Sequence, residues 1–119
     1  MDIRRKRAYD EPAISDGYRV LIDRLWPRGV SKTDAEIDEW ARELAPTTEL
    51  RRWFGHEPER FEEFRQRYTT ELEAHEDKLR ELRGRARKGR LTLVYSARDE
   101  EHNDAVVLDE LLRRGRRSV

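Results

Sequence analysis

Cysteine is absent from this chain of 119 residues, and that absence excludes several kinds of site at once. Without a thiol there can be no disulfide, no zinc–thiolate centre and no cysteine nucleophile. Long apolar runs are also absent, and none approaches the roughly 20 residues that a transmembrane helix needs. The basic residues at positions 1–6 are not followed by the apolar stretch of a secretion signal. We therefore expect a cytoplasmic protein without a membrane partner.

An excess of charge of either sign is missing as well. The chain has 26 lysines and arginines against 26 acidic residues, so its formal net charge is zero. Dedicated nucleic-acid-binding domains are usually clearly basic, and this balance therefore argues against a nucleic-acid partner. The basic cluster at residues 113–117 could still contact phosphates, or it could neutralise the negative end of its own helix.

Hydrophobic residues make up only 35% of the chain, but they gather in patterned segments, which argues against disorder. A chain of this length is long enough to bury one core. The sequence contains no linker and no internal repeat. We therefore predict one domain over residues 1–119.

Three short segments have the pattern of β-strands. Residues 18–25 and 91–96 each carry an apolar run between turn formers, as expected for strands buried in a parallel sheet. Residues 3–9 are more mixed and predict an edge strand. Strands and helical segments alternate along the chain, and this order favours an α/β fold, a mostly parallel sheet flanked by helices.

Two short helices are expected between the first strands and the middle of the chain. Residues 31–34 have the S-x-x-D form of a capping box, and apolar residues over 37–44 follow at helical spacing. A second short helix would begin at the threonines at 47–48 and end at Gly55.

The later part of the chain predicts longer helices. The strongest begins near Pro58 and stops at residues 88–89, with a break expected over 73–76 because about 30 residues make a long helix for so small a domain. A final helix carries the apolar residues of 105–112 and ends at Gly115.

A binding site is expected where the two buried strands end, because open parallel sheets bind ligands beyond the carboxyl ends of their strands. Guanidinium groups near a helix N-terminus suit an anion, which would be held by Arg24, Arg28 and Arg98. The other candidates at these ends are polar or aromatic side chains that could orient a ligand or offer it a flat face: Trp26, Tyr95, Ser96 and Asn103.

Simpler interpretations remain open for these residues. Arg24 could pair with Asp23 or Glu101 instead of a ligand. Trp26, followed by a proline, could be a packed corner of the fold, which we favour over a stacking platform.

Chemistry, if the domain performs any, would depend on His102 and Asp99 as the groups that transfer a proton. We place His102 in the first turn of the last helix, and we note that Asp99 is a natural N-cap, a role that would explain it fully. Ser96 lies six residues before His102 and belongs to no G-x-S-x-G motif, which argues against a serine nucleophile.

Metal and cofactor motifs are missing. His56, His75 and His102 lack the spacing of metal ligands, and the chain has no glycine motif of a nucleotide-binding loop. We therefore predict no metal site and assign no cofactor.

Three segments resemble a known family. These are residues 19–32, residues 43–56 and residues 91–108, which include the Asp-Arg-Leu-Trp-Pro-Arg-Gly and Val-Tyr-Ser-Ala-Arg-Asp stretches. They are similar, in colinear order over nearly the whole chain, to the YeaO-like family, a branch of the DUF488 family. The resemblance implies a small prokaryotic, cytoplasmic α/β domain. It implies no activity, substrate or cofactor, so no catalytic residue is carried over.

The leading hypothesis is a domain that binds a small anionic or nucleotide-like ligand, and the sequence leaves open whether it is also an enzyme. The alternative is a non-catalytic interaction module, in which Trp40, Trp53 and Phe54 would build a homodimer face. Membership of the core is the simpler explanation for these aromatic residues. Nucleic-acid binding through the C-terminal arginines is a third hypothesis.

Overall fold

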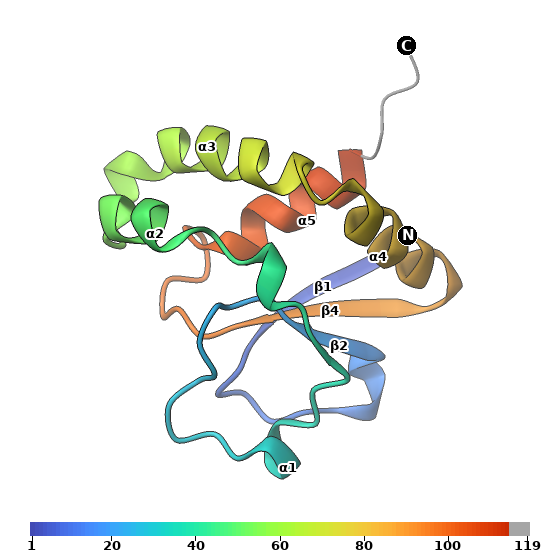
Figure 1. The fold of residues 1–119 in the computed structure, drawn as a ribbon. Helices are drawn as coiled ribbons and strands as arrows, with labels where there is room; N and C mark the ends of the chain where they lie inside the picture. The colour runs from blue at the N-terminus through green and yellow to red at the C-terminus, as the bar shows by residue number, and fades with distance from the viewer. Residues whose placement is uncertain (115–119) are drawn as a thin grey trace.

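The computed structural model describes residues 1–114, which form one four-stranded sheet with helices around it (Figure 1). The strand order is β1–β4–β2–β3, and every neighbouring pair is parallel. This confirms the predicted α/β class. The strands span Asp2–Arg7 (β1), Tyr18–Leu21 (β2), Glu39–Trp40 (β3) and Arg90–Tyr95 (β4).

The apolar β4 strand lies near the middle of the sheet and pairs with strands on both sides. Leu91 faces Ile3 of β1 and Tyr18 of β2 in the register of the two pairs. Five of its six residues are buried, as expected for a strand that is covered on both faces. β1 is an edge strand, as predicted, but it ends at Arg7.

The helices place most of the core on one face of the sheet. Figure 1 shows α3, α4 and α5 above this face, with α2 beside them. The opposite face has a smaller cluster, in which Leu21 and Val94 pack against Trp26, Ile37 and Trp40. The five helices span Lys32–Ala35 (α1), Thr48–Phe54 (α2), Phe61–Glu73 (α3), Glu76–Lys88 (α4) and Asp104–Arg114 (α5).

Most helix ends follow the predicted signals. The Ser31 hydroxyl accepts a hydrogen bond from the Asp34 amide and begins α1. The Thr47 hydroxyl likewise accepts the Leu50 amide at the start of α2, and Gly55 ends that helix in the left-handed region, with φ of 55°. Pro58 begins a short 3₁₀ turn that leads into α3. The expected break is real, because α3 ends at Glu73 and α4 begins at Glu76.

The prediction of a helix over residues 37–44 is wrong. α1 stops at Glu36, which adopts a left-handed φ of 48°. The chain then pairs with β2, because the Ala41 amide donates to the Leu21 carbonyl, and residues 42–44 form a 3₁₀ turn. Apolar spacing alone does not separate these outcomes, since a short edge strand followed by a tight turn buries the same side chains.

The last helix begins later than predicted. α5 starts at Asp104, with the Asn103 side chain accepting the Val106 amide, so Asn103 rather than Asp99 caps it. Asp99 caps the preceding turn instead, accepting the amides of Glu101 and His102. His102 therefore precedes the helix and is not in its first turn. The predicted stop at Gly115 lies outside the described residues.

β2 is shorter than predicted, and this positions the site. The regular strand ends at Leu21, although the Ile22 amide still donates to the Val94 carbonyl. Asp23 and Arg24 therefore leave the sheet and turn toward the carboxyl end of β4.

Among residues 1–114, none of the helices has the length and apolar character to cross a bilayer.

Candidate functional site

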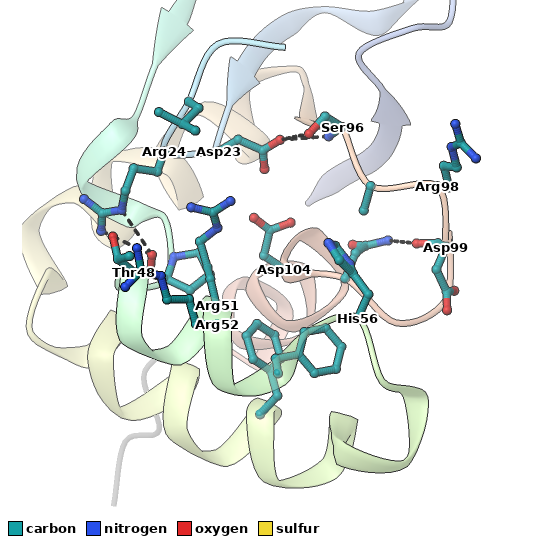
Figure 2. A pocket seen from close by; sticks show the side chains of 16 residues that line it. Asp23, Arg24, Thr48, Arg51, Arg52, His56, Ser96, Arg98, Asp99 and Asp104 are labelled. Atoms are coloured by element: carbon teal, nitrogen blue, oxygen red, sulfur yellow. Dashed lines mark hydrogen bonds between the residues drawn. The ribbon is translucent and has the colours of Figure 1, made fainter. Parts of the chain in front are cut away.

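A cavity of about 850 Å³ opens beyond the carboxyl ends of β2 and β4 (Figure 2). Its lining comes from residues 23–25 after β2, six residues in and around α2, Phe64 of α3, and residues 96–99 and 103–104 between β4 and the start of α5. The volume lies within the range of small-molecule sites. The cavity is where the strand-end rule for parallel sheets places a ligand.

Asp23 is fixed by the strand next to it. Its Oδ2 atom accepts hydrogen bonds from the Ser96 amide at 2.8 Å and from the Ser96 hydroxyl at 2.6 Å. These bonds tie the end of β2 to the end of β4. They leave the other oxygen of Asp23 without a hydrogen bond from a donor in residues 1–114.

Asp104, the first residue of α5, faces Asp23 in the cavity wall (Figure 2). Burial, followed by the negative charge of Asp23 and the hydrogen bond that a protonated Asp104 donates to it, raises the pKa of Asp104 well above its ordinary 3.8. The residue keeps part of its surface open to the cavity, but its carboxyl group lies among protein atoms. Asp104 therefore holds a proton to a higher pH than an isolated aspartate would.

Four arginines line the same cavity: Arg24, Arg51, Arg52 and Arg98. Arg24 is held in place because its Nε and Nη2 atoms donate to the Pro46 carbonyl at 3.3 and 3.2 Å. The guanidinium groups of the other three make no hydrogen bond, ion pair or ring contact with any part of residues 1–114. Figure 2 shows Arg24, Arg51 and Arg52 on one side of the carboxyl pair and Arg98 on the other.

Aromatic side chains form the remaining wall. Phe54 and Phe64 stack with ring centroids 4.4 Å apart and present an apolar surface to the cavity. His56 lies beside Phe54 and adopts a positive φ of 58°, a backbone conformation that residues other than glycine rarely adopt. Because such a backbone costs free energy, it is often found where a side chain must point into a site.

Five of the residues proposed from the sequence line this cavity: Arg24, Ser96, Arg98, Asp99 and Asn103. Two of them have clear structural tasks as well. Ser96 donates to Asp23, and Asn103 caps α5 while its amide donates to the Asp99 carbonyl at 2.8 Å. The structure brings these residues together, and their roles toward a ligand stay predictions.

Four other proposed residues lie outside the lining. Arg28 is exposed on the loop after β2, and its carbonyl accepts from the Tyr9 hydroxyl. Trp26 packs edge-on against Trp40 with its indole nitrogen donating to the Val30 carbonyl, which matches the packed-corner interpretation.

Tyr95 is buried, with 3% of its surface exposed, and does not reach the cavity. His102 binds the Asp99 carboxylate through Nδ1 at 2.9 Å and packs edge-on against Phe61, and it is not part of the cavity lining.

Sequence reasoning missed the groups that the fold brings closest to the centre, namely Asp23, Asp104, Arg51, Arg52 and His56. A signal was present for all five, because each falls within one of the three segments that resemble the family. The Asp23–Asp104 pair joins residues 81 positions apart and gives no local pattern. Within residues 1–114, no group of three histidine or acidic side chains could hold a metal ion.

Comparisons with known proteins place the chain in a family. The family model described as the inactive DUF488-N3 subclade matches residues 2–117. The uncharacterized protein YeaO of Escherichia coli is 49% identical over 113 residues, which cover 95% of this chain and 98% of that protein. The uncharacterized proteins Mb3100c of Mycobacterium bovis and Rv3073c of Mycobacterium tuberculosis are each 41% identical over 111 residues, covering 92% of both chains. No solved structure matches significantly. The chain therefore belongs to the YeaO-like branch of the DUF488 family, as its motifs predicted.

Proposed function

We propose that this protein binds a small anionic ligand, such as a phosphate ester or a nucleotide, in the cavity beyond β2 and β4. The observation that supports this most strongly is the set of arginines without partners. Arg51, Arg52 and Arg98 line one concave site, yet none lies within ion-pair distance of a carboxylate of residues 1–114. Guanidinium groups that converge without a protein partner are well suited to bidentate bonds with phosphate.

The rest of the molecule gives the contrast that makes this pattern informative. Arg65 pairs with Glu62 and Glu110, Arg90 pairs with Asp2, and Arg113 pairs with Asp109. An exposed arginine is by itself unremarkable, because a highly charged surface has many. Three such arginines around one cavity, with Arg24 held beside them, make an electrostatic site for an anion.

The charge of the lining fits a dianion. Four arginines face three aspartates, and one of these, Asp104, holds a proton more tightly than usual because it is buried beside Asp23. With that proton in place, the lining carries two more positive than negative charges. A phosphate monoester at neutral pH carries close to two negative charges.

Binding without catalysis is the favoured form of this proposal. The subclade that matches the chain is described as inactive. His102, a proton-transfer candidate from the sequence, is not among the residues that line the cavity and packs against Phe61. If the domain did perform acid–base chemistry, the Asp23–Asp104 pair would be a candidate group for it in the lining. The predicted cytoplasmic location would expose the site to phosphorylated metabolites.

A titration with propyl phosphate tests the proposal. When the ligand concentration is 100 times its dissociation constant, the free energy of unfolding of the wild-type protein should rise by roughly 2.7 kcal/mol. This corresponds to a rise in Tm on the order of 10 °C. The double variant Arg51→Gln/Arg52→Gln should lose about tenfold or more in affinity, since each charge-assisted bond contributes roughly 1.5–3 kcal/mol. Isothermal titration calorimetry would measure both affinities.

Two control variants sharpen this test. Arg87→Gln removes an exposed arginine of α4, on another part of the molecule, and should leave the affinity unchanged. Arg28→Gln removes an arginine that the sequence assigned to the site and the structure places outside the cavity lining, so its affinity should also stay within about twofold of wild type. An equal loss in all three variants would show general charge attraction and would refute the assigned cavity.

The alternative hypothesis, a homodimer face built from Trp40, Trp53 and Phe54, has less support from their positions. Phe54 is buried in the core, Trp53 packs against that core, and Trp40 belongs to the cluster on the other sheet face. These three side chains therefore do not form one exposed apolar patch.

A further inference from the structure

The Asp23–Asp104 pair makes a purely anionic ligand an incomplete match for the cavity. A phosphate satisfies the arginines, but two carboxyl groups at the centre of the same cavity would repel it. The ligand must therefore present a different chemical group to the pair. The two carboxyl groups and the partner-free arginines are separate features of the cavity, and each indicates the chemistry of one end of the ligand.

The free oxygens of the pair define which group fits. Asp23 uses Oδ2 for both bonds from Ser96, and Asp104 uses Oδ1 for the Ala105 amide. Apart from the carboxyl proton of Asp104 itself, no donor of residues 1–114 reaches Asp23 Oδ1 or Asp104 Oδ2. One oxygen on each carboxyl group is therefore available to a ligand, and the two oxygens belong to groups that lie against each other.

A hydroxyl group matches this arrangement better than a cation or an anion. A pair that shares one proton can both donate and accept, and a hydroxyl also does both. An ammonium group only donates, and it would lie beside the four arginines of the lining. Two adjacent hydroxyls could each bond to one carboxyl group.

We propose that the ligand is a phosphorylated polyol, with its phosphate on the arginines and a pair of neighbouring hydroxyls on Asp23 and Asp104. This inference rests on the proposed function and narrows it to one class of anion, which includes sugar phosphates and nucleotides with an intact ribose. Phe54 and His56 complete the wall beside the carboxyl pair and contact the carbon skeleton of the ligand.

Three phosphate monoesters of nearly equal size separate the alternatives. Glycerol 3-phosphate carries two adjacent hydroxyls, propyl phosphate carries none, and phosphoethanolamine carries an ammonium group. We expect calorimetry at pH 7 to give glycerol 3-phosphate an affinity at least about tenfold above that of propyl phosphate, because two hydrogen bonds to carboxyl groups are gained. Phosphoethanolamine should bind no better than propyl phosphate.

Variants of Asp104 then locate the hydroxyl contact. In Asp104→Asn the side-chain amide donates to Asp23 and occupies its free oxygen, so the preference for glycerol 3-phosphate should fall to within about twofold. Asp104→Leu removes both oxygens and should do the same, with a melting curve to show that each variant is folded. Asp77→Asn, at an almost fully exposed position of α4, is the matched control and should keep the wild-type preference.

The outcomes distinguish this inference from the proposal beneath it. Equal binding of all three esters, weakened by Arg51→Gln/Arg52→Gln, would overturn the polyol inference and keep the anion site. Tightest binding by phosphoethanolamine would overturn it too, in favour of an ammonium contact. Failure of every ester to bind at millimolar concentration would overturn both proposals.

Discussion

Two clusters of charged residues lie at opposite ends of β2, and only one of them has its charges compensated by protein partners. Near the start of β2, Asp16 accepts hydrogen bonds from Lys6, Arg19 and the Ala13 amide. The guanidinium group of Arg19, 3% exposed, also donates twice to the Ala35 carbonyl. At the other end of the strand, arginines lack partners in residues 1–114 and two carboxyl groups face each other.

The first cluster therefore stabilises the fold, whereas the second lacks protein partners for its charged groups. Burial alone would raise the pKa of Asp16, but the bonds from Ala13, Lys6 and Arg19 outweigh it and hold that pKa below 3.8. At Asp104 burial and a second carboxyl act in the same direction, and the pKa is raised well above 3.8. Groups that cost stability in the free protein are typical of binding sites, where a ligand supplies the missing partners.

The largest effect is expected where the charges are fully compensated. Asp16→Asn leaves Arg19 buried without a carboxylate, and it should lower the free energy of unfolding by about 3 kcal/mol. Urea denaturation followed by circular dichroism would measure this change. Asp77→Asn on α4 is the exposed control, with an expected change within about 0.5 kcal/mol. A loss for Asp16→Asn no greater than that of the control would remove the basis of the comparison.

The two clusters should also give stability opposite dependences on pH. The lowered pKa of Asp16 contributes stability above pH 3.8 that is lost as pH falls through its folded value. The raised pKa of Asp104 contributes stability below pH 3.8 that diminishes as pH rises toward its folded value.

Asp104→Asn should therefore be more stable than wild type at neutral pH, and its advantage should shrink in acid. Denaturation midpoints at several pH values would measure the difference between the two proteins. A difference that does not vary with pH would contradict the shared proton.

The smallest effect is expected from the strained backbone beside the cavity. His56→Gly should raise the free energy of unfolding by about 0.5 kcal/mol, because glycine adopts a positive φ without a steric cost. Glu36→Gly relieves a similar φ of 48° far from the cavity lining and should give a similar gain.

Only the His56 variant should also weaken binding of glycerol 3-phosphate. Equal affinities in the two glycine variants would show that His56 does not contact the ligand.

The sequence predicted the sheet and most helix ends because those features depend on local chemistry. The capping residues Ser31 and Thr47, the stop at Gly55 and the break before Glu76 act within a few positions of their own helices. The segment over residues 37–44 was misjudged because its conformation depends on pairing with β2, a contact with a distant part of the chain.

The position of the cavity was predicted from the sequence, but only part of its lining was. The rule for parallel sheets located the correct strand ends and identified Arg24, Ser96 and Arg98 among the lining residues. It could not show that α2 turns Arg51 toward the same cavity, or that α5 begins with Asp104 against Asp23. Those placements follow from how helices pack on the sheet, which spacing along the chain does not encode.

The central claim is that the partner-free arginines, and not the paired ones, bind the ligand. Nuclear magnetic resonance of the arginine Nε–H groups tests this directly during a titration with glycerol 3-phosphate. We predict saturable shifts of the signals of Arg51, Arg52 and Arg98, while those of Arg65 and Arg83, which have protein partners, stay unchanged. Shifts spread evenly over paired and partner-free arginines, or shifts that never saturate, would contradict a specific anion site in this cavity.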